Sequence, residues 1–235
     1  MINGFNIFSV KRKNRHKRYF MKEQMIMKKL AVFDLDGTLN RTDLYSVPAH
    51  LKALAERGIH HVTPEQIIST FGERASDYVR KLAGDVTDEE ARSYLDAVAK
   101  YELEFIYDKG KPYDGTLESL KKLKDNGYYT AICSNSSRRY ITMVLDALGL
   151  MPYIDFIQEL QPDMIKVQTL ALLLEKEKPD RAVMVGDRFF DVEAGHKNNL
   201  KTIGCMYGFN PGELKDADVK IDSAADIYEA VAALI

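Results

Sequence analysis

Hydrophobic and polar positions alternate in two ways along the chain, and the change between them predicts its secondary structure. Short apolar runs lie at 29–34, 129–134, 182–187, 201–206 and 217–221. Between these runs, apolar residues recur at helical spacing over 116–125, 137–148, 167–175, 189–197 and 224–234. Short buried strands separated by helices are typical of a parallel sheet with helices on both faces. We therefore predict an α/β fold.

The stretch 44–110 departs from this alternation, because helical spacing continues through it without an intervening strand. Leu51, Leu54 and Ala55 share one helical face, and further apolar faces follow before residue 110. Glycine and proline residues separate the pieces, which indicates several short helices. The pattern predicts a small all-helical domain, 44–110, inserted into a core formed by 29–43 and 111–235.

Basic residues are concentrated at the amino-terminal end of the chain. Residues 1–29 contain nine Lys and Arg against Glu23 alone, so the remainder carries 24 basic and 34 acidic residues. We expect residues 1–28 to form a disordered basic extension, because loose charged runs are usually solvated. Binding of this run to nucleic acid or to anionic lipid is the alternative.

Composition excludes several other classes of protein. Hydrophobic residues make up 46% and charged residues 29%, an ordinary globular balance. No apolar run approaches the roughly 20 residues that span a bilayer, so we expect no membrane partner. Cys133 and Cys205 form no CxxC pair. A disulfide scaffold and a zinc site are therefore disfavoured, and a reducing, cytoplasmic location is expected.

Polar side chains follow three of the predicted strands at the points where these strands end. They are Asp34 and Asp36, Ser134 and Asn135, and Asp187 with Asp191. Because ligands of parallel sheets bind at the carboxyl ends of the strands, we expect these residues to meet. Four carboxylates held this close repel one another unless a cation relieves them. Mg²⁺ prefers oxygen ligands, so Asp34, Asp36, Asp187 and Asp191 predict a magnesium site.

The segments FDLDGTLN, ICSNSS and VGDRFFD, in this order, resemble motifs of the haloacid dehalogenase-like (HAD) hydrolase superfamily. The resemblance covers residues 29 to 235 and implies a Rossmann-like core with a helical cap. It implies that Asp34 is a nucleophile that forms a phospho-aspartate and that Asp36 is the general acid and base. The backbone carbonyl of Asp36 usually joins the metal shell in this family. The second Asp argues for phosphoryl transfer rather than dehalogenation.

The second and third motifs of the superfamily suggest further site residues. Ser134 and the backbone N–H of Asn135 are expected to hold a phosphoryl oxygen. The usual Lys-Pro of the third motif is replaced by Gln161-Pro162-Asp163. Lys166, which opens the next helix, resembles the form found in the phosphoglycolate-phosphatase-like branch. We therefore expect Lys166 to bind and stabilise the phosphoryl group.

Arg74, in the expected substrate-facing loop of the cap, is a candidate to pair with an anionic group of the substrate. A surface arginine at a helix boundary is the alternative. The resemblance favours a magnesium-dependent phosphatase, acting as a monomer or homodimer on a small phosphorylated metabolite such as phosphoglycolate or a nucleotide. A sugar phosphomutase and an inorganic pyrophosphatase are alternatives on the same scaffold. A silent core that binds nucleic acid through its basic extension is a further alternative.

Overall fold

The computed structural model describes residues 27–235, so the expectations for residues 1–26 lie outside the described part of the chain. Six strands in this part form one parallel sheet with the order β3-β2-β1-β4-β5-β6. The strands are β1 (Lys29–Phe33), β2 (Tyr129–Cys133), β3 (Phe156–Gln158), β4 (Arg181–Gly186), β5 (Lys201–Cys205) and β6 (Val219–Ile221). This sheet confirms the predicted α/β fold. Strand β3 escaped prediction because three partly buried edge residues are too few to set a pattern.

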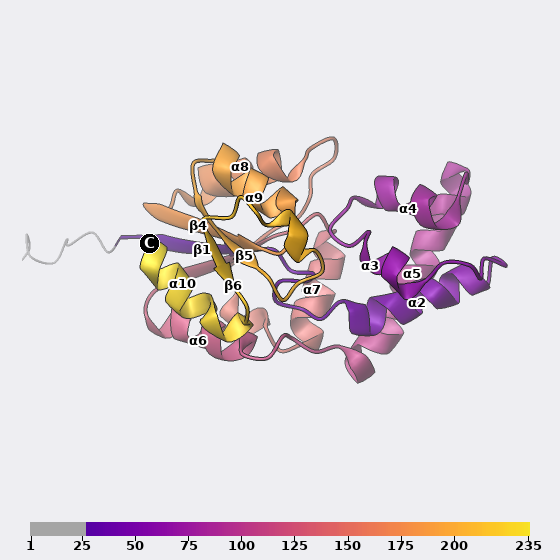
Figure 1. Ribbon diagram of the computed structural model, residues 1–235, viewed down its shortest axis with the longest axis horizontal. Coiled ribbons are helices and arrows are strands. Elements are labelled where there is room, and N and C mark those ends of the chain that lie inside the picture. The colour runs from indigo at the N-terminus through magenta and orange to yellow at the C-terminus, as the bar shows by residue number, and fades with distance from the viewer. Residues whose placement is uncertain (1–26) are drawn as a thin grey trace, which may run out of the picture.

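Helices cover both faces of the sheet (Figure 1). They are α6 (Thr116–Asp125), α7 (Arg138–Ala147), α8 (Lys166–Glu177), α9 (Phe189–Lys197) and α10 (Ile227–Leu234). Strand β1 shows how one sequence serves two layers, because successive side chains of a strand point to opposite faces. Ala31 and Phe33 pack with residues of α6, α7 and α10, while Leu30 and Val32 pack with residues of α8 and α9. The predicted helix at 224–234 begins with a 3₁₀ turn, Ala224–Asp226, before α10.

The order of the strands places a crevice at the carboxyl end of β1. The chain runs from β1 outward to β2 and β3, and then returns to β4 on the other side of β1. The direction in which successive strands are added therefore reverses beside β1. A crevice opens at the carboxyl ends of the strands where this reversal occurs, and ligands bind there. The segments that follow β2, β1 and β4 carry the polar residues singled out from the sequence, and they lie side by side at this crevice.

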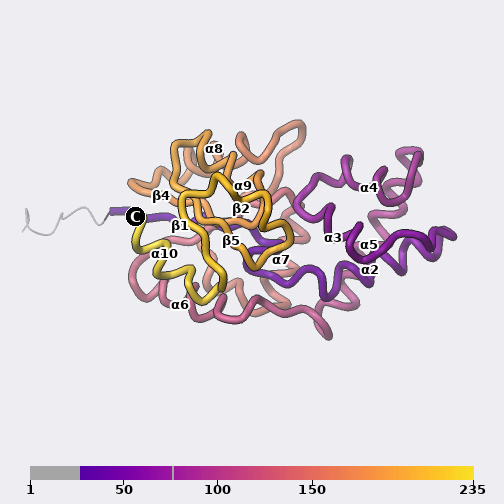
Figure 2. Tube along the Cα trace, viewed as in Figure 1, coloured from indigo at the N-terminus to yellow at the C-terminus, as the bar shows by residue number. Residues whose placement is uncertain are grey.

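Four helices form a second unit at the carboxyl edge of the sheet (Figure 2). They are α2 (Asp43–Ala55), α3 (Pro64–Ile68), α4 (Ala75–Ala83) and α5 (Asp88–Lys109), called the cap from here on. The cap has its own apolar core, which includes Leu54, Ile67, Val79 and Val98. No helix within residues 27–235 is long and apolar enough to cross a membrane.

Candidate active site

A buried lysine bridges two carboxylates at the carboxyl ends of β1 and β4. Lys166 is the first residue of α8, and its side chain is 4% exposed. Its Nζ lies 2.7 Å from Oδ1 of Asp34 and 2.5 Å from Oδ1 of Asp191. These two charges raise the pKa of Lys166 although burial opposes the charged form. The residue therefore carries a fixed positive charge against the predicted nucleophile.

Asp187 completes a cluster of three buried carboxylates. One oxygen from each of Asp34, Asp187 and Asp191 lies within 4.8 Å of the others. Asp187 accepts hydrogen bonds from Oγ1 of Thr38 at 3.2 Å and from the backbone N–H of Phe209 at 2.9 Å. Burial and then the charges of Asp34 and Asp191 raise the pKa of Asp187 well above its usual range.

The charges of this cluster fit a divalent cation. Three buried carboxylates face one ammonium, that of Lys166, so two negative charges remain without a partner in the cluster. Buried charges need compensation, and oxygen ligands suit a hard cation such as magnesium. The carboxylates that could hold the ion are those of Asp34, Asp187 and Asp191. The side chain of Asp36 lies outside this cluster, and a ligand role for its backbone carbonyl stays a prediction.

Two glycines let the loops approach this closely. Gly37 has φ +80°, a left-handed conformation that side chains disfavour, and a Cβ there would collide with the carboxylate of Asp187. A Cβ on Gly186 would collide with the carboxylate of Asp191 in the same way. Asp191 also accepts a hydrogen bond from the backbone N–H of Arg188 at 3.0 Å, which ties the start of α9.

The carboxylate of Asp36 is turned away from the cluster and toward the cap. Its Oδ1 accepts hydrogen bonds from Thr42 at 2.6 Å, Tyr140 at 2.9 Å and Asn40 at 3.2 Å. Burial, partly offset by the bond from Thr42, raises the pKa of Asp36, and the charge of Asp34 adds to the increase. The protonated form of Asp36 is therefore favoured compared with a free aspartate, as a general acid requires.

The segment after β2 lies against both the core and the cap. Ser134 is buried, and its Oγ accepts a hydrogen bond from the backbone N–H of Ser136 at 3.1 Å. Helix α7 begins at Arg138, one residue after the predicted start. The side chain of Asn135 donates to the carbonyl of Gly72 in the cap at 2.8 Å. Asn135 therefore contacts the cap loop as well as standing beside Ser134.

Arg74 is the residue immediately before α4 and is partly exposed. Its Nε lies 2.9 Å from Oδ2 of Asp77, so the charge of Arg74 is already paired within the cap. One cavity of about 280 Å³ is lined by Arg74 together with Asn135 and Lys166. Phe189 of α9 also lines it. The structure therefore brings Arg74 near the predicted phosphate ligands, and its role in substrate binding stays a prediction.

Arg188, which sequence reasoning missed, joins the core to the cap. This buried side chain donates to the carbonyl of Phe71 in the cap and lies 2.8 Å from Oε2 of Glu213. The ring of Phe209 packs against Phe71 with centroids 5.0 Å apart. No local motif marks these contacts, since the partners are far apart in sequence. They hold the cap against the crevice.

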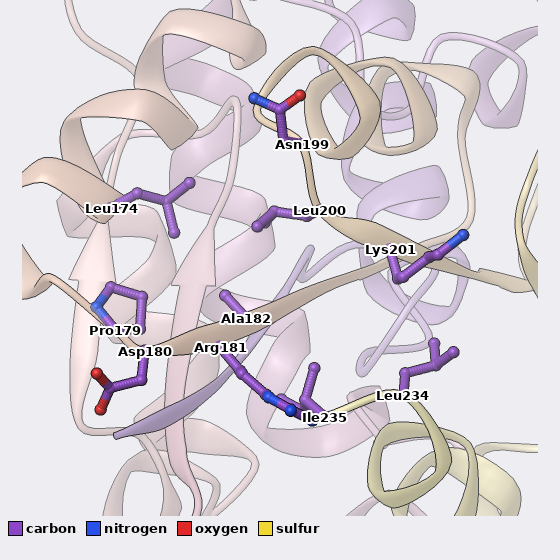
Figure 3. Close-up of a pocket in the computed structure, with 10 residues that line it drawn as sticks. All are labelled: Leu174, Pro179, Asp180, Arg181, Ala182, Asn199, Leu200, Lys201, Leu234 and Ile235. Atoms are coloured by element: carbon purple, nitrogen blue, oxygen red, sulfur yellow. The ribbon is translucent and has the colours of Figure 1, made fainter. Parts of the chain in front are cut away.

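A second cavity of about 280 Å³, called the cap cavity, opens between the cap and the core. Its lining includes Asp36, Ser46, His50, Glu102 and Tyr140. Another cavity, of about 400 Å³, lies at the amino ends of β4 and β5 (Figure 3). That cavity is on the opposite edge of the sheet from the carboxylate cluster, so it has no part in the site.

Comparison with known proteins agrees with this geometry. The sequence matches the haloacid dehalogenase-like hydrolase family over residues 31–205. It is 31% identical to the phosphoglycolate phosphatase of Aquifex aeolicus over 208 residues, which are 86% of this chain and 95% of the relative. It is 28% identical to pyrophosphatase PpaX of Bacillus pumilus over 188 residues, 77% of this chain and 85% of the relative. The crystal structure of a predicted phosphatase from Clostridium acetobutylicum covers 88% of this chain and 100% of that chain, with a TM-score of 0.78 and 24% identity.

The chain therefore belongs to the haloacid dehalogenase-like hydrolase family. Within the family it is a phosphatase of the phosphoglycolate-phosphatase-like branch. Phosphatases of this family generally use a metal ion, and the cluster of Asp34, Asp187 and Asp191 is suited to hold one.

Proposed function

We propose that the protein is a magnesium-dependent phosphatase that hydrolyses a small phosphate monoester through a phospho-aspartate on Asp34. The observation that carries the proposal is the buried ion pair of Asp34 with Lys166, which lies beside two further carboxylates. A carboxylate is a weak nucleophile, so its attack on phosphorus depends on positioning and charge neutralisation. Both are built into this crevice.

In the first step, an oxygen of Asp34 forms a bond to phosphorus while the bond to the leaving oxygen breaks. Asp36 gives its proton to that leaving oxygen. Three donors fix Oδ1 of Asp36, and Oδ2 has one long contact, 3.4 Å from Oγ of Ser136, so Oδ2 is placed to carry the proton. Lys166 lies against Asp34 and balances charge on the phosphoryl group.

In the second step, water attacks the phosphorus of the phospho-aspartate. Asp36, which is now ionised, accepts the proton of that water. The bond between phosphorus and Asp34 breaks, inorganic phosphate leaves, and the carboxylate of Asp34 is restored. Ser134 and Asn135 are expected to hold phosphoryl oxygens through both steps. Magnesium held by Asp34, Asp187 and Asp191 would supply further charge neutralisation to those oxygens.

Two substitutions test this function. Asp34→Asn removes the nucleophile while keeping its shape, so phosphate release from p-nitrophenyl phosphate should fall to background. Asp36→Asn removes the general acid of the first step and the base that activates water in the second. Because p-nitrophenolate leaves without a proton, radiolabelled p-nitrophenyl phosphate should still phosphorylate this variant, and the label should accumulate on the protein during a single turnover. Peptide mapping should locate the label on Asp34. Wild-type activity in Asp34→Asn, or a label on another residue, would refute the mechanism.

A sugar phosphomutase is a second candidate, favoured by the hydroxyl-bearing side chains that line the cap cavity, among them Ser46, Thr70 and Tyr140. A mutase would use Asp34 and Asp36 in the same roles but return the phosphoryl group to another hydroxyl. Incubation with a hexose phosphate distinguishes the two functions. Release of inorganic phosphate supports the phosphatase, and an isomeric product without phosphate release supports the mutase.

A further inference from the structure

The cap cavity contains a buried carboxylate that the proposed mechanism does not use. Glu102, on α5, is 7% exposed and lines this cavity. Its Oε1 accepts a hydrogen bond from Oγ of Ser46 at 2.6 Å. Among the residues that the structure describes, no Lys, Arg or His forms an ion pair with Glu102, and Oε2 makes no hydrogen bond. A carboxyl group buried without a cation costs stability, so a role in binding would explain why it is there.

His50 gives the cavity a second polar group without a complete set of partners. Its ring is 3% exposed, and its Nδ1 lies 2.5 Å from the hydroxyl of Tyr94. Within residues 27–235, Nε2 of His50 makes no hydrogen bond. Burial lowers the pKa of His50 to about 4, so the ring is neutral near pH 7. His50 therefore provides hydrogen bonding but no positive charge.

The lining of the cap cavity is unsuited to an anion. No lysine or arginine is among the described residues that line it, whereas Asp36, Glu73 and Glu102 all are. Glu73 is paired with Lys81, whose Nζ lies 2.6 Å from its Oε1, and Lys81 does not line the cavity. A carboxylate placed in this cavity would lose its water of hydration without gaining a cation to balance its charge.

The leaving group of the substrate must occupy this same cavity. Asp36 lines the cap cavity and gives its proton to the leaving oxygen, so the leaving group lies on the Asp36 side of the phosphorus. The neighbouring cavity near Lys166 is not lined by Asp36, and its Arg74 is already paired with Asp77. Hydroxyl groups on the leaving group would provide the partners that Glu102 and His50 lack.

We propose that Glu102 is a specificity-determining residue, and that with His50 it selects a neutral, polyhydroxylated leaving group, as in a sugar monophosphate, over the carboxylate of phosphoglycolate. The inference rests on the proposed function, because the cavity receives a leaving group only when Asp34 takes the phosphoryl group. Burial raises the pKa of Glu102 to about 8, and the protonated carboxyl can both donate to and accept from a sugar hydroxyl. The volume of about 280 Å³ lies just below the usual range of ligand pockets, roughly 300–1,000 Å³, so it suits a small leaving group.

The test compares consumption of four esters by the full chain with magnesium near neutral pH. They are a hexose 6-phosphate, 2-phosphoglycolate, phosphoethanolamine and p-nitrophenyl phosphate. We expect kcat/KM for the hexose phosphate to exceed that for phosphoglycolate by about tenfold or more, since buried polar groups reject a ligand that leaves them unpaired. Isomerisation of the hexose phosphate counts as consumption, so the result does not depend on the fate of the phosphoryl group.

Variants of one helix separate binding from structure. Glu102→Ala should lower kcat/KM for the hexose phosphate by about tenfold, mostly through KM, the usual loss for one buried hydrogen bond. The same variant should hydrolyse p-nitrophenyl phosphate with nearly the wild-type kcat/KM, because the leaving group of this ester has no additional hydroxyl to bond with Glu102. Glu102→Gln keeps the shape and a donor and should retain the preference. Glu104→Ala, on the exposed side of α5, should match the wild type on every ester.

Three results would overturn the inference. The first is an equal kcat/KM for phosphoglycolate and the hexose phosphate in a wild type that hydrolyses p-nitrophenyl phosphate normally. A preference for phosphoethanolamine would instead show that Glu102 is ionised and pairs with a cation. An equal loss on all four esters in Glu102→Ala would indicate a structural role. If the wild type consumes none of the esters, the proposed function itself fails, and the specificity inference fails with it.

Discussion

Replacing Lys166 with alanine tests the charge balance on which the site depends. The ammonium lies 2.7 Å from Asp34 and 2.5 Å from Asp191, and its side chain is 4% exposed. Lys166→Ala leaves both carboxylates buried without that cation. Breaking a buried pair by removing one partner costs about 3–5 kcal/mol. At about 2–4 °C per kcal/mol for a chain of this size, the melting temperature should fall on the order of 10 °C.

Activity should fall more steeply than stability, because Lys166 faces the charge that develops on the phosphoryl group. Removing one such preorganised donor lowers kcat by about 10²–10³-fold. The assay is phosphate release from p-nitrophenyl phosphate at a temperature where both proteins are folded by circular dichroism. Gln161→Ala is the matched control, since Gln161 occupies the position where relatives usually carry the motif lysine and makes only a 3.4 Å contact to the carbonyl of Glu159. Equal losses in the two variants would refute the assignment of Lys166.

The loss of stability in Lys166→Ala should depend on pH. Burial raises the pKa of Asp191 to about 6, and Lys166 opposes that rise. Without the lysine the pKa of Asp191 should rise further. A carboxyl whose pKa is raised on folding stabilises the protein below its unfolded pKa, and that stability is lost as pH rises through the folded pKa. The difference in melting temperature from the wild type should therefore be smaller near pH 5 than near pH 8. A difference that does not change with pH would contradict this account.

Three further predictions concern the metal, the cap and Glu102. Magnesium at about 100 times its dissociation constant should stabilise the wild type by about 2.7 kcal/mol, and Asp187→Asn should abolish this shift; an unchanged shift would place the metal elsewhere. Arg188→Ala removes the bond to Phe71 and the pair with Glu213, so the melting temperature should fall and KM should rise with little change in kcat; a lower kcat at constant KM would argue against a role in holding the cap. The pKa of Glu102 is raised to about 8, so the wild type should lose on the order of 3 kcal/mol between about pH 5 and 8 relative to Glu102→Gln. Parallel pH profiles of stability for the two proteins would contradict this pKa.

The local pattern of apolar residues was sufficient to predict most helices and strands of the core. The helices at 116–125 and 189–197 have the bounds that apolar spacing predicted, and α8 begins at Lys166 as expected. The polar residues Asp34, Ser134 and Asp187 each follow a short apolar run, so a parallel sheet placed them at one edge. These features depend on neighbours within a few residues, which is why the sequence alone was enough.

Only the tertiary structure decided which polar groups face one another. The sequence placed Asp34 and Asp36 together at one strand end, and the fold turns the carboxylate of Asp36 toward Thr42 and Tyr140. It also carries Glu102 into the cap cavity beside Ser46, a residue 56 positions earlier. Such pairs depend on how helices pack across the crevice, and no period along the chain records that packing. The sequence by itself thus determined the class of reaction and the edge of the sheet where it occurs. Long-range packing decided the direction of each side chain, and with it the chemistry of the cap cavity.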